Sequence, residues 1–93
     1  MYYIYILKCA DDSYYVGFTT NLISRMKQHN DKTGGTYTGI RTPVQLVYKE
    51  EHKLEYKARN REKQLKGWTR QKKEALIKGD KKLLIELSKN KRK

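Results

Sequence analysis

Five side chains of this sequence are of the types that carry out proton transfer or bind phosphate and metal ions. Tyr5 and Tyr15 stand ten residues apart, and a phenol can donate, accept or transfer a proton. Arg25 can hold a phosphate with two parallel hydrogen bonds and stabilise charge that builds on it. His29 can accept or relay a proton, and Glu62 can offer a carboxylate to a divalent cation. These groups could act as one site only if the fold brings them together.

The two tyrosines lie in segments whose composition favours β-strands. Residues 2–8 and 14–18 are rich in tyrosine, isoleucine and valine, and a turn signal separates them, which predicts an antiparallel hairpin. Side chains alternate along a strand, so Tyr5 and Tyr15 share a face only if odd positions pair with odd positions. A two-residue turn at Asp11–Asp12 would send Tyr15 to the other face. A shared site therefore predicts an odd-length loop or a bulge.

A glycine inside the second of these strands, Gly17, supports a functional interpretation. Such a glycine indicates a bulge or the close approach of another group, and here it could let a phosphate or water come near Tyr15. The alternative is that Tyr5 and Tyr15 do ordinary sheet packing, because residues 1–15 contain five tyrosines.

A helix is predicted over residues 22–30, after the second strand. Leu22 and Met26 are four residues apart and form its inward stripe. Arg25 and His29, also four apart, lie one position round from that stripe and would project onto a shared surface. The alternative is that both are solvated at the helix edge.

Glu62 falls on the apolar face of a second predicted helix, over residues 53–66. The buried stripe of this helix has three predicted members: Leu54, Ala58 and Leu65. A carboxylate on such a face is costly unless something pairs with it, and a divalent cation would meet that need. The alternative is an internal salt bridge to Arg25 or Arg59.

The remaining elements complete an α+β fold with a three-stranded antiparallel sheet flanked by helices, in the order β-β-α-β-α-α. A third strand is predicted over 44–50, after a glycine-containing loop over 31–43. Its pattern places one set of side chains on one face: Val44, Leu46 and Tyr48. The intervening residues would face the other way: Gln45, Val47 and Lys49. Helices are predicted over 69–78 and 81–88, and residues 81–93 form a basic C-terminal helix and tail after a domain of residues 1–80.

The positive charge of the chain is concentrated in its second half. The chain has 22 Lys and Arg against 10 Asp and Glu, a formal net charge of +12. Residues 53–93 hold 16 of these cations and 5 of the acids, a net charge of +11. Polyanions, and nucleic acids above all, are the natural partners of such a surface. The alternative is a solvated, lysine-rich helical surface.

Bulk properties limit the other possibilities. A chain of 93 residues forms one domain at most. Cys9 is the only cysteine, which excludes an intramolecular disulfide and a cysteine-based zinc site and fits a reducing cytoplasm. No apolar run approaches the roughly 20 residues of a membrane-spanning helix. We therefore expect a cytoplasmic monomer without membrane contact.

The two tyrosine segments resemble the paired motif that names the GIY-YIG nuclease superfamily. The motifs here are Tyr3-Ile4-Tyr5 and Tyr15-Val16-Gly17. Tyr3 stands where the name has Gly and Val16 stands for Ile, whereas both key tyrosines and the final glycine keep their places. The run from residue 58 to 68 is similar to the metal-binding helix of small bacterial members, and residues 37–43 are similar to the segment before their third strand.

The resemblance implies a metal-dependent endonuclease that hydrolyses DNA phosphodiester bonds. It further implies recognition of DNA by structure rather than sequence, in repair or recombination, with one Mg²⁺ or Mn²⁺ held by Glu62. The expected catalytic residues are Tyr5, Tyr15, Arg25 and His29. The expected DNA contacts are Thr19, Lys27, Tyr37, Arg41, Arg59, Lys63 and Lys66. Gly17 and Trp68 are expected to be structural.

Two alternatives from other functional classes remain open. The same fold could serve as a non-catalytic DNA- or RNA-binding module, whose binding would weaken steeply with salt. It could also be a small subunit that docks on an acidic partner, which would retain no DNA at moderate salt. Cleavage and retention of DNA distinguish the three.

Overall fold

A computed structural model describes residues 1–30 and 43–90, with the backbone alone for residues 29, 30, 89 and 90. The elements are β1 (Tyr2–Lys8), β2 (Tyr14–Thr19), α1 (Leu22–Asn30), β3 (Gln45–His52), α3 (Glu55–Lys66), α4 (Arg70–Lys78) and α5 (Lys81–Asn90). Their order and type confirm the predicted α+β fold, and each boundary lies within two residues of its predicted position. Residues 31–42 of the predicted loop and the tail over 91–93 lie outside the described residues.

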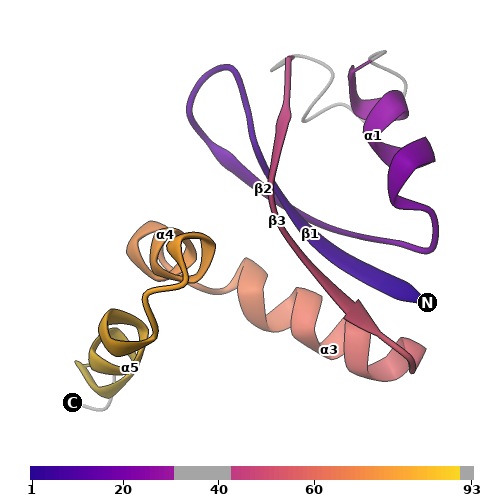
Figure 1. Ribbon diagram of the computed structural model, residues 1–93. Coiled ribbons are helices and arrows are strands. Elements are labelled where there is room, and N and C mark those ends of the chain that lie inside the picture. Colours follow the sequence, from indigo (N-terminus) through magenta and orange to yellow (C-terminus); the bar gives the residue numbers. More distant parts are fainter. Residues whose placement is uncertain (31–42, 91–93) are drawn as a thin grey trace.

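The three strands form one antiparallel sheet in the order β2-β1-β3, so β1 is central. Helix α1 lies on one face of the sheet and α3 on the other, while α4 and α5 continue beyond the edge of the sheet (Figure 1). None of the helices in the described ranges is long and apolar enough to cross a membrane.

Each face of the sheet has its own buried cluster. The cluster on the α3 side consists of Ile4, Ile6, Val16, Ala58 and Leu65. The cluster on the α1 side consists of Tyr5, Leu7, Cys9 and Val44, against which Tyr15, Leu22, Met26 and Leu46 pack. Because side chains alternate along β1, the odd-numbered positions face α1 and the even-numbered positions face α3. The candidate tyrosines therefore belong to the α1 side.

A bulge in β3 changes which side chains face α1. Ile6 pairs with Tyr48 whereas Leu7 pairs with Leu46, so Val47 is the extra residue. As a result Tyr48 packs with the α3-side cluster and Leu46 with the α1-side cluster. The prediction that Val44, Leu46 and Tyr48 share one face is therefore wrong for Tyr48, because the extra residue reverses the alternation.

A partly buried ion pair between Arg61 and Glu50 holds α3 against β3, and Arg61 directly precedes Glu62. The Arg61 guanidinium lies 2.9 Å from the Glu50 carboxylate. The Tyr48 hydroxyl donates to this carboxylate, and His52 Nε2 lies 3.0 Å from it. Burial opposes ionisation of Glu50, but the hydrogen bonds outweigh it and hold its pKa below the usual value. This network fixes the turn of α3 that carries Glu62.

Two leucines of the same helix region should differ sharply in their contribution to stability. Leu65 is 0% exposed, whereas Leu54 precedes the first turn of α3 and is 46% exposed, which makes the prediction of a buried Leu54 wrong. We expect Leu65→Ala to lower the free energy of unfolding by about 2–5 kcal/mol because it leaves a cavity. Leu54→Ala, the control, should cost less than about 1 kcal/mol. Urea denaturation measures both, and similar losses would contradict the packing described above.

Candidate active site

The hairpin loop sets the relative positions of the two candidate tyrosines. The Cys9 amide donates to the Ser13 carbonyl at 2.9 Å, which leaves a loop of three residues between them. Asp12, the last of the three, has a left-handed φ of 74°, as is common in three-residue hairpin loops. The odd-length loop that a shared face requires is therefore confirmed.

The register places both phenols on the α1 face of the sheet. Tyr5 pairs with Gly17, and Tyr15 pairs with Leu7. The rings of Tyr5 and Tyr15 are diagonal neighbours, with centroids 6.4 Å apart and planes tilted by 42°. Tyr5 is 0% exposed, whereas Tyr15 is only partly buried. Of the pair, Tyr15 is therefore the phenol that a solvent molecule or substrate can reach.

Gly17 makes room for the Tyr5 ring. A Cβ placed on Gly17 would lie 2.3 Å from both Cζ and the hydroxyl oxygen of Tyr5. We expected this space to admit a phosphate or water near Tyr15, but the Tyr5 phenol fills it. The group that comes close to Gly17 is therefore the Tyr5 side chain.

Helix α1 carries Arg25 to the Tyr5 phenol. The Asn21 side chain caps the helix by accepting a hydrogen bond from a first-turn amide at 3.0 Å. Leu22 and Met26 pack on the α1-side cluster, which orients the helix. Arg25 lies one position round from this stripe, is partly buried, and hydrogen-bonds to Tyr5. The predicted edge position of Arg25 therefore brings its guanidinium into the site.

Glu62 lies on α3, the helix on the other face of the sheet. Its side chain is 19% exposed and pairs with Lys66 at 3.1 Å. Of the two arginines considered as alternative partners, Arg59 pairs with Glu55 at 2.8 Å. The negative charge of Glu62 is the smallest of the influences that raise the pKa of Tyr5.

These neighbours determine the ionisation of Tyr5. Burial raises the pKa of Tyr5 from 10.0 to about 12, with further upward contributions from Tyr15 and Glu62. The charge and hydrogen bond of Arg25 act in the opposite direction. Tyr5 therefore keeps its proton at neutral pH, and its oxygen accepts the hydrogen bond that the Arg25 guanidinium donates.

An alkaline titration followed by tyrosinate absorbance should detect this environment. Burial and Glu50 also raise the pKa of Tyr48 to about 12. We expect Tyr5→Phe and Tyr48→Phe each to remove one phenol that ionises near pH 12, well above the ordinary value of about 10. Because the folded-state pKa of Tyr5 exceeds its unfolded value, its contribution to stability is complete below about pH 10 and is lost as pH rises towards 12. Loss of a phenol that ionises near pH 10 in Tyr5→Phe would contradict the packing of this ring.

Glu62 is the residue that fits a divalent cation. Across residues 1–30 and 43–90, no group of three or more His, Cys, Asp or Glu could enclose a metal. Mg²⁺ often binds through one or two carboxylates and completes its shell with waters and substrate phosphate. A single, mostly buried carboxylate suits such an ion, and one carboxylate does not suit structural zinc.

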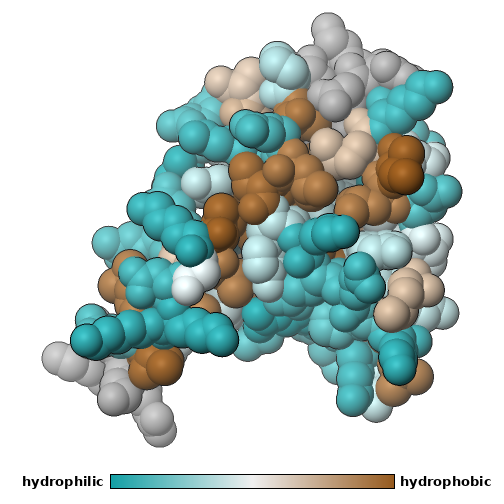
Figure 2. Space-filling view, viewed as in Figure 1, coloured by the Kyte–Doolittle hydropathy of each residue, from teal (hydrophilic) through white to brown (hydrophobic). Residues whose placement is uncertain are grey.

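The predicted DNA contacts fall into three groups. Four are exposed cations on α1 and α3: Lys27, Arg59, Lys63 and Lys66. The face of the molecule in Figure 2 is largely hydrophilic, with hydrophobic side chains gathered near its centre. Thr19 is 5% exposed, and its hydroxyl is engaged with the backbone of Asn21, so it is not placed to contact DNA and that prediction is corrected. Tyr37, Arg41 and the side chain of His29 lie outside the described residues.

Trp68 packs against the α3-side cluster. The Arg61 guanidinium lies 5.2 Å and the Lys72 ammonium 4.3 Å from its ring centroid. These contacts place Trp68 away from the tyrosines, on the opposite side of the sheet.

Lys49 is a site neighbour that the sequence pattern did not predict. It lies opposite Tyr5 on β3 and is exposed. Strict alternation would put Lys49 on the face opposite to Leu46, but the bulge at Val47 turns it toward α1. Only knowledge of the bulge could have revealed this position.

Comparisons with known proteins agree with this geometry. A family profile described as the GIY-YIG catalytic domain matches residues 1–75. UPF0213 proteins of Staphylococcus aureus strains Mu3 and Mu50 are each 43% identical over 77 residues, which cover 83% of this chain and 94% of theirs. A UPF0213 protein of Bacillus halodurans, solved by solution NMR, is 38% identical, with 84% of each chain covered and a TM-score of 0.56. The chain therefore belongs to the GIY-YIG family, and its homologues are the small bacterial UPF0213 proteins.

Proposed function

We propose that the protein is a metal-dependent endonuclease that hydrolyses phosphodiester bonds of DNA. The observation that carries this proposal is the pair of phenols on the α1 face of the sheet, Tyr5 and Tyr15, whose ring centroids are 6.4 Å apart and beside which α1 places Arg25. Glu62, on α3, is the carboxylate that the proposal adds to them. A guanidinium, a reachable phenol and a carboxylate are the groups that phosphodiester hydrolysis needs to bind phosphate, orient water and hold a cation. Membership of the GIY-YIG family supports the same conclusion.

Arg25 binds the scissile phosphate in this proposal. Its fork can donate to two phosphate oxygens and stabilise the charge that builds on them. Tyr5 is fully buried and hydrogen-bonds to Arg25, so it is a positioning residue that orients the guanidinium. Such orientation matters because a displacement of about 1 Å at a reacting group can cost roughly 100-fold in rate.

Tyr15 orients the attacking water, because its phenol is the more accessible of the two. Glu62 holds Mg²⁺ or Mn²⁺, which when bound would supply positive charge beside the phosphate. His29, one turn after Arg25 on α1, is assigned a proton-relay role. Tyr15, rather than Tyr5, is therefore the phenol that we assign to the attacking water.

The basic half of the chain provides sequence-independent affinity. Residues 53–93 have a net charge of +11, and the exposed cations of α3 lie on the helix that carries Glu62. Phosphate contacts of this kind position DNA without reading its sequence. Tyr37 and Arg41 are proposed as further contacts, and structure-directed cleavage in repair or recombination is the proposed role.

A cleavage assay tests the proposal. Labelled single-stranded, duplex, flapped and four-way-junction DNA are incubated with Mg²⁺ or Mn²⁺ and wild-type protein, Tyr15→Phe or Tyr56→Phe. Tyr56 is 61% exposed on α3, so its variant is a matched control. We expect cutting by wild type and the control, and loss of cutting in Tyr15→Phe. Gel-shift binding without cutting on every substrate would instead indicate a non-catalytic module.

A further inference from the structure

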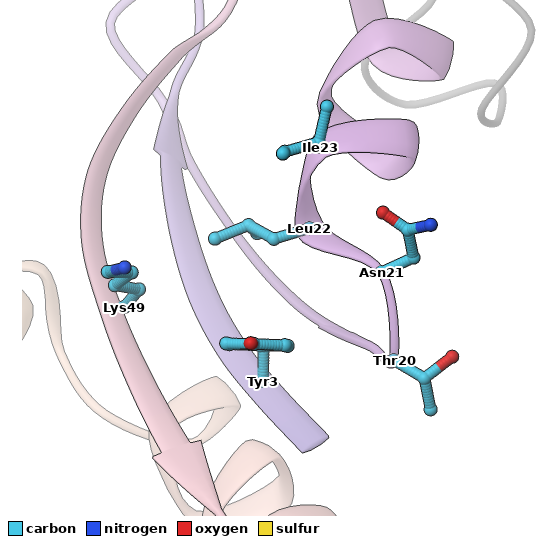
Figure 3. A pocket seen from close by; sticks show the side chains of 6 residues that line it. All are labelled: Tyr3, Thr20, Asn21, Leu22, Ile23 and Lys49. Carbon is cyan, nitrogen blue, oxygen red and sulfur yellow. The ribbon is translucent and has the colours of Figure 1, made fainter. Parts of the chain in front are cut away.

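A pocket of about 270 Å³ opens on the α1 face of the sheet, between the strands and the start of α1 (Figure 3). Six residues line it: Tyr3, Thr20, Asn21, Leu22, Ile23 and Lys49. Leu22 and Ile23 point from α1 toward the strands that carry Tyr3 and Lys49, whereas the side chains of Thr20 and Asn21 point away. None of the proposed catalytic residues is among the six.

The pocket nevertheless begins beside the proposed active site. Lys49 lies directly opposite Tyr5 on the neighbouring strand, where side chains are about 5 Å apart. Tyr3 is two residues before Tyr5 on the same face of β1, a separation of about 7 Å. That distance equals about two base steps of a stacked DNA strand. A strand held at Arg25 would therefore reach this pocket within one or two nucleotides.

The chemistry of the lining suits a nucleotide. An aromatic ring and two aliphatic side chains form its walls, and one lysine supplies the only formal charge among the six residues. Ile23 is 85% exposed, so an apolar side chain stands open to a ligand next to a cation. Bases of any sequence stack on aromatic rings, and an ammonium group binds phosphate. Glu51 pairs with Tyr3 across the strands but does not line the pocket. The charge that faces the pocket is therefore the positive charge of Lys49.

We propose that this pocket holds one unpaired nucleotide next to the scissile phosphate, with the base against Tyr3, Leu22 and Ile23 and its phosphate on Lys49. The proposal rests on the proposed nuclease function and narrows its substrate to DNA with an unpaired segment. A paired base cannot enter without leaving the helical stack, at a cost that an unpaired base does not bear. Single strands, flaps and overhangs are thus preferred over continuous duplex.

Binding measurements without divalent metal test the pocket separately from cleavage. Fluorescence anisotropy compares a labelled single strand with a hairpin duplex of the same composition. We expect Tyr3→Leu and Ile23→Asp each to weaken single-strand binding about tenfold and duplex binding no more than about twofold. The matched controls are Tyr56→Leu and Ile85→Asp, at positions 61% and 57% exposed away from the pocket, and they should change neither affinity by more than about twofold.

Ile23→Asp keeps the test informative if Tyr3→Leu fails to fold, because so exposed a side chain contributes little to the core. Equal losses on single strand and duplex, or no loss on either, would overturn the pocket proposal even if wild type cuts DNA. A selective loss of single-strand binding with no cutting by wild type on any substrate would refute the nuclease function while supporting the nucleotide site.

Discussion

Glu62→Gln is expected to reduce DNA cleavage at least about 100-fold, the scale on which single preorganised charged or polar groups contribute to catalysis. Glutamine keeps the size of the side chain but removes the negative charge that would hold the divalent ion. DNA affinity should stay within about twofold, because the exposed cations of α1 and α3 are unchanged. Stability should also change little, since the Glu62–Lys66 pair spans one helical turn and such pairs contribute about 0.3–0.5 kcal/mol.

A neighbouring carboxylate provides the control for this variant. Glu55 lies on the same helix, is 51% exposed and pairs with Arg59, so Glu55→Gln removes an equal charge away from the tyrosines. We expect Glu55→Gln to cut DNA at the wild-type rate. Titration calorimetry with Mn²⁺ and a non-cleavable DNA analogue should show weaker ion binding in Glu62→Gln alone. Full cleavage by Glu62→Gln would refute the assigned role of this residue.

The hairpin is where sequence reasoning reached furthest toward the site. Because the side-chain period of a strand is two residues, Tyr5 and Tyr15 can share a face only if the loop between their strands has an odd number of residues. The observed loop between Cys9 and Ser13 meets that requirement. The position of Arg25 followed in the same way from the helical period and the inward stripe of Leu22 and Met26.

Features that depend on contacts between elements were not predictable. The bulge at Val47 has no composition signal, yet it reverses the faces of Tyr48 and Lys49. Thr19 seemed free to meet DNA, but its hydroxyl closes the turn into α1 through Asn21. The helical period also counted Leu54 as buried, whereas α3 begins only after it. In each case the tertiary arrangement decided between placements that the local pattern allowed equally.

Gly17 is the position where a single methyl group should disturb the site most. An alanine Cβ would lie 2.3 Å from both Cζ and the hydroxyl oxygen of Tyr5, far inside van der Waals contact. The fully buried ring must move, and with it the hydroxyl that hydrogen-bonds to Arg25. We expect Gly17→Ala to lower the free energy of unfolding by about 1–3 kcal/mol through overpacking. Cleavage should fall roughly 100-fold through displacement of the guanidinium.

A second glycine and a double variant make this expectation specific. At Gly67, where φ is −84°, an added Cβ would lie no nearer than 3.6 Å to a neighbour among the described residues, so Gly67→Ala should leave stability and cleavage nearly unchanged. Tyr5→Leu removes the ring atoms with which the new methyl collides. The cost of Gly17→Ala measured by urea denaturation should therefore be smaller in the Tyr5→Leu background than in wild type. Equal costs in both backgrounds would mean that Gly17 is required for a reason other than the Tyr5 ring, such as the close approach of DNA.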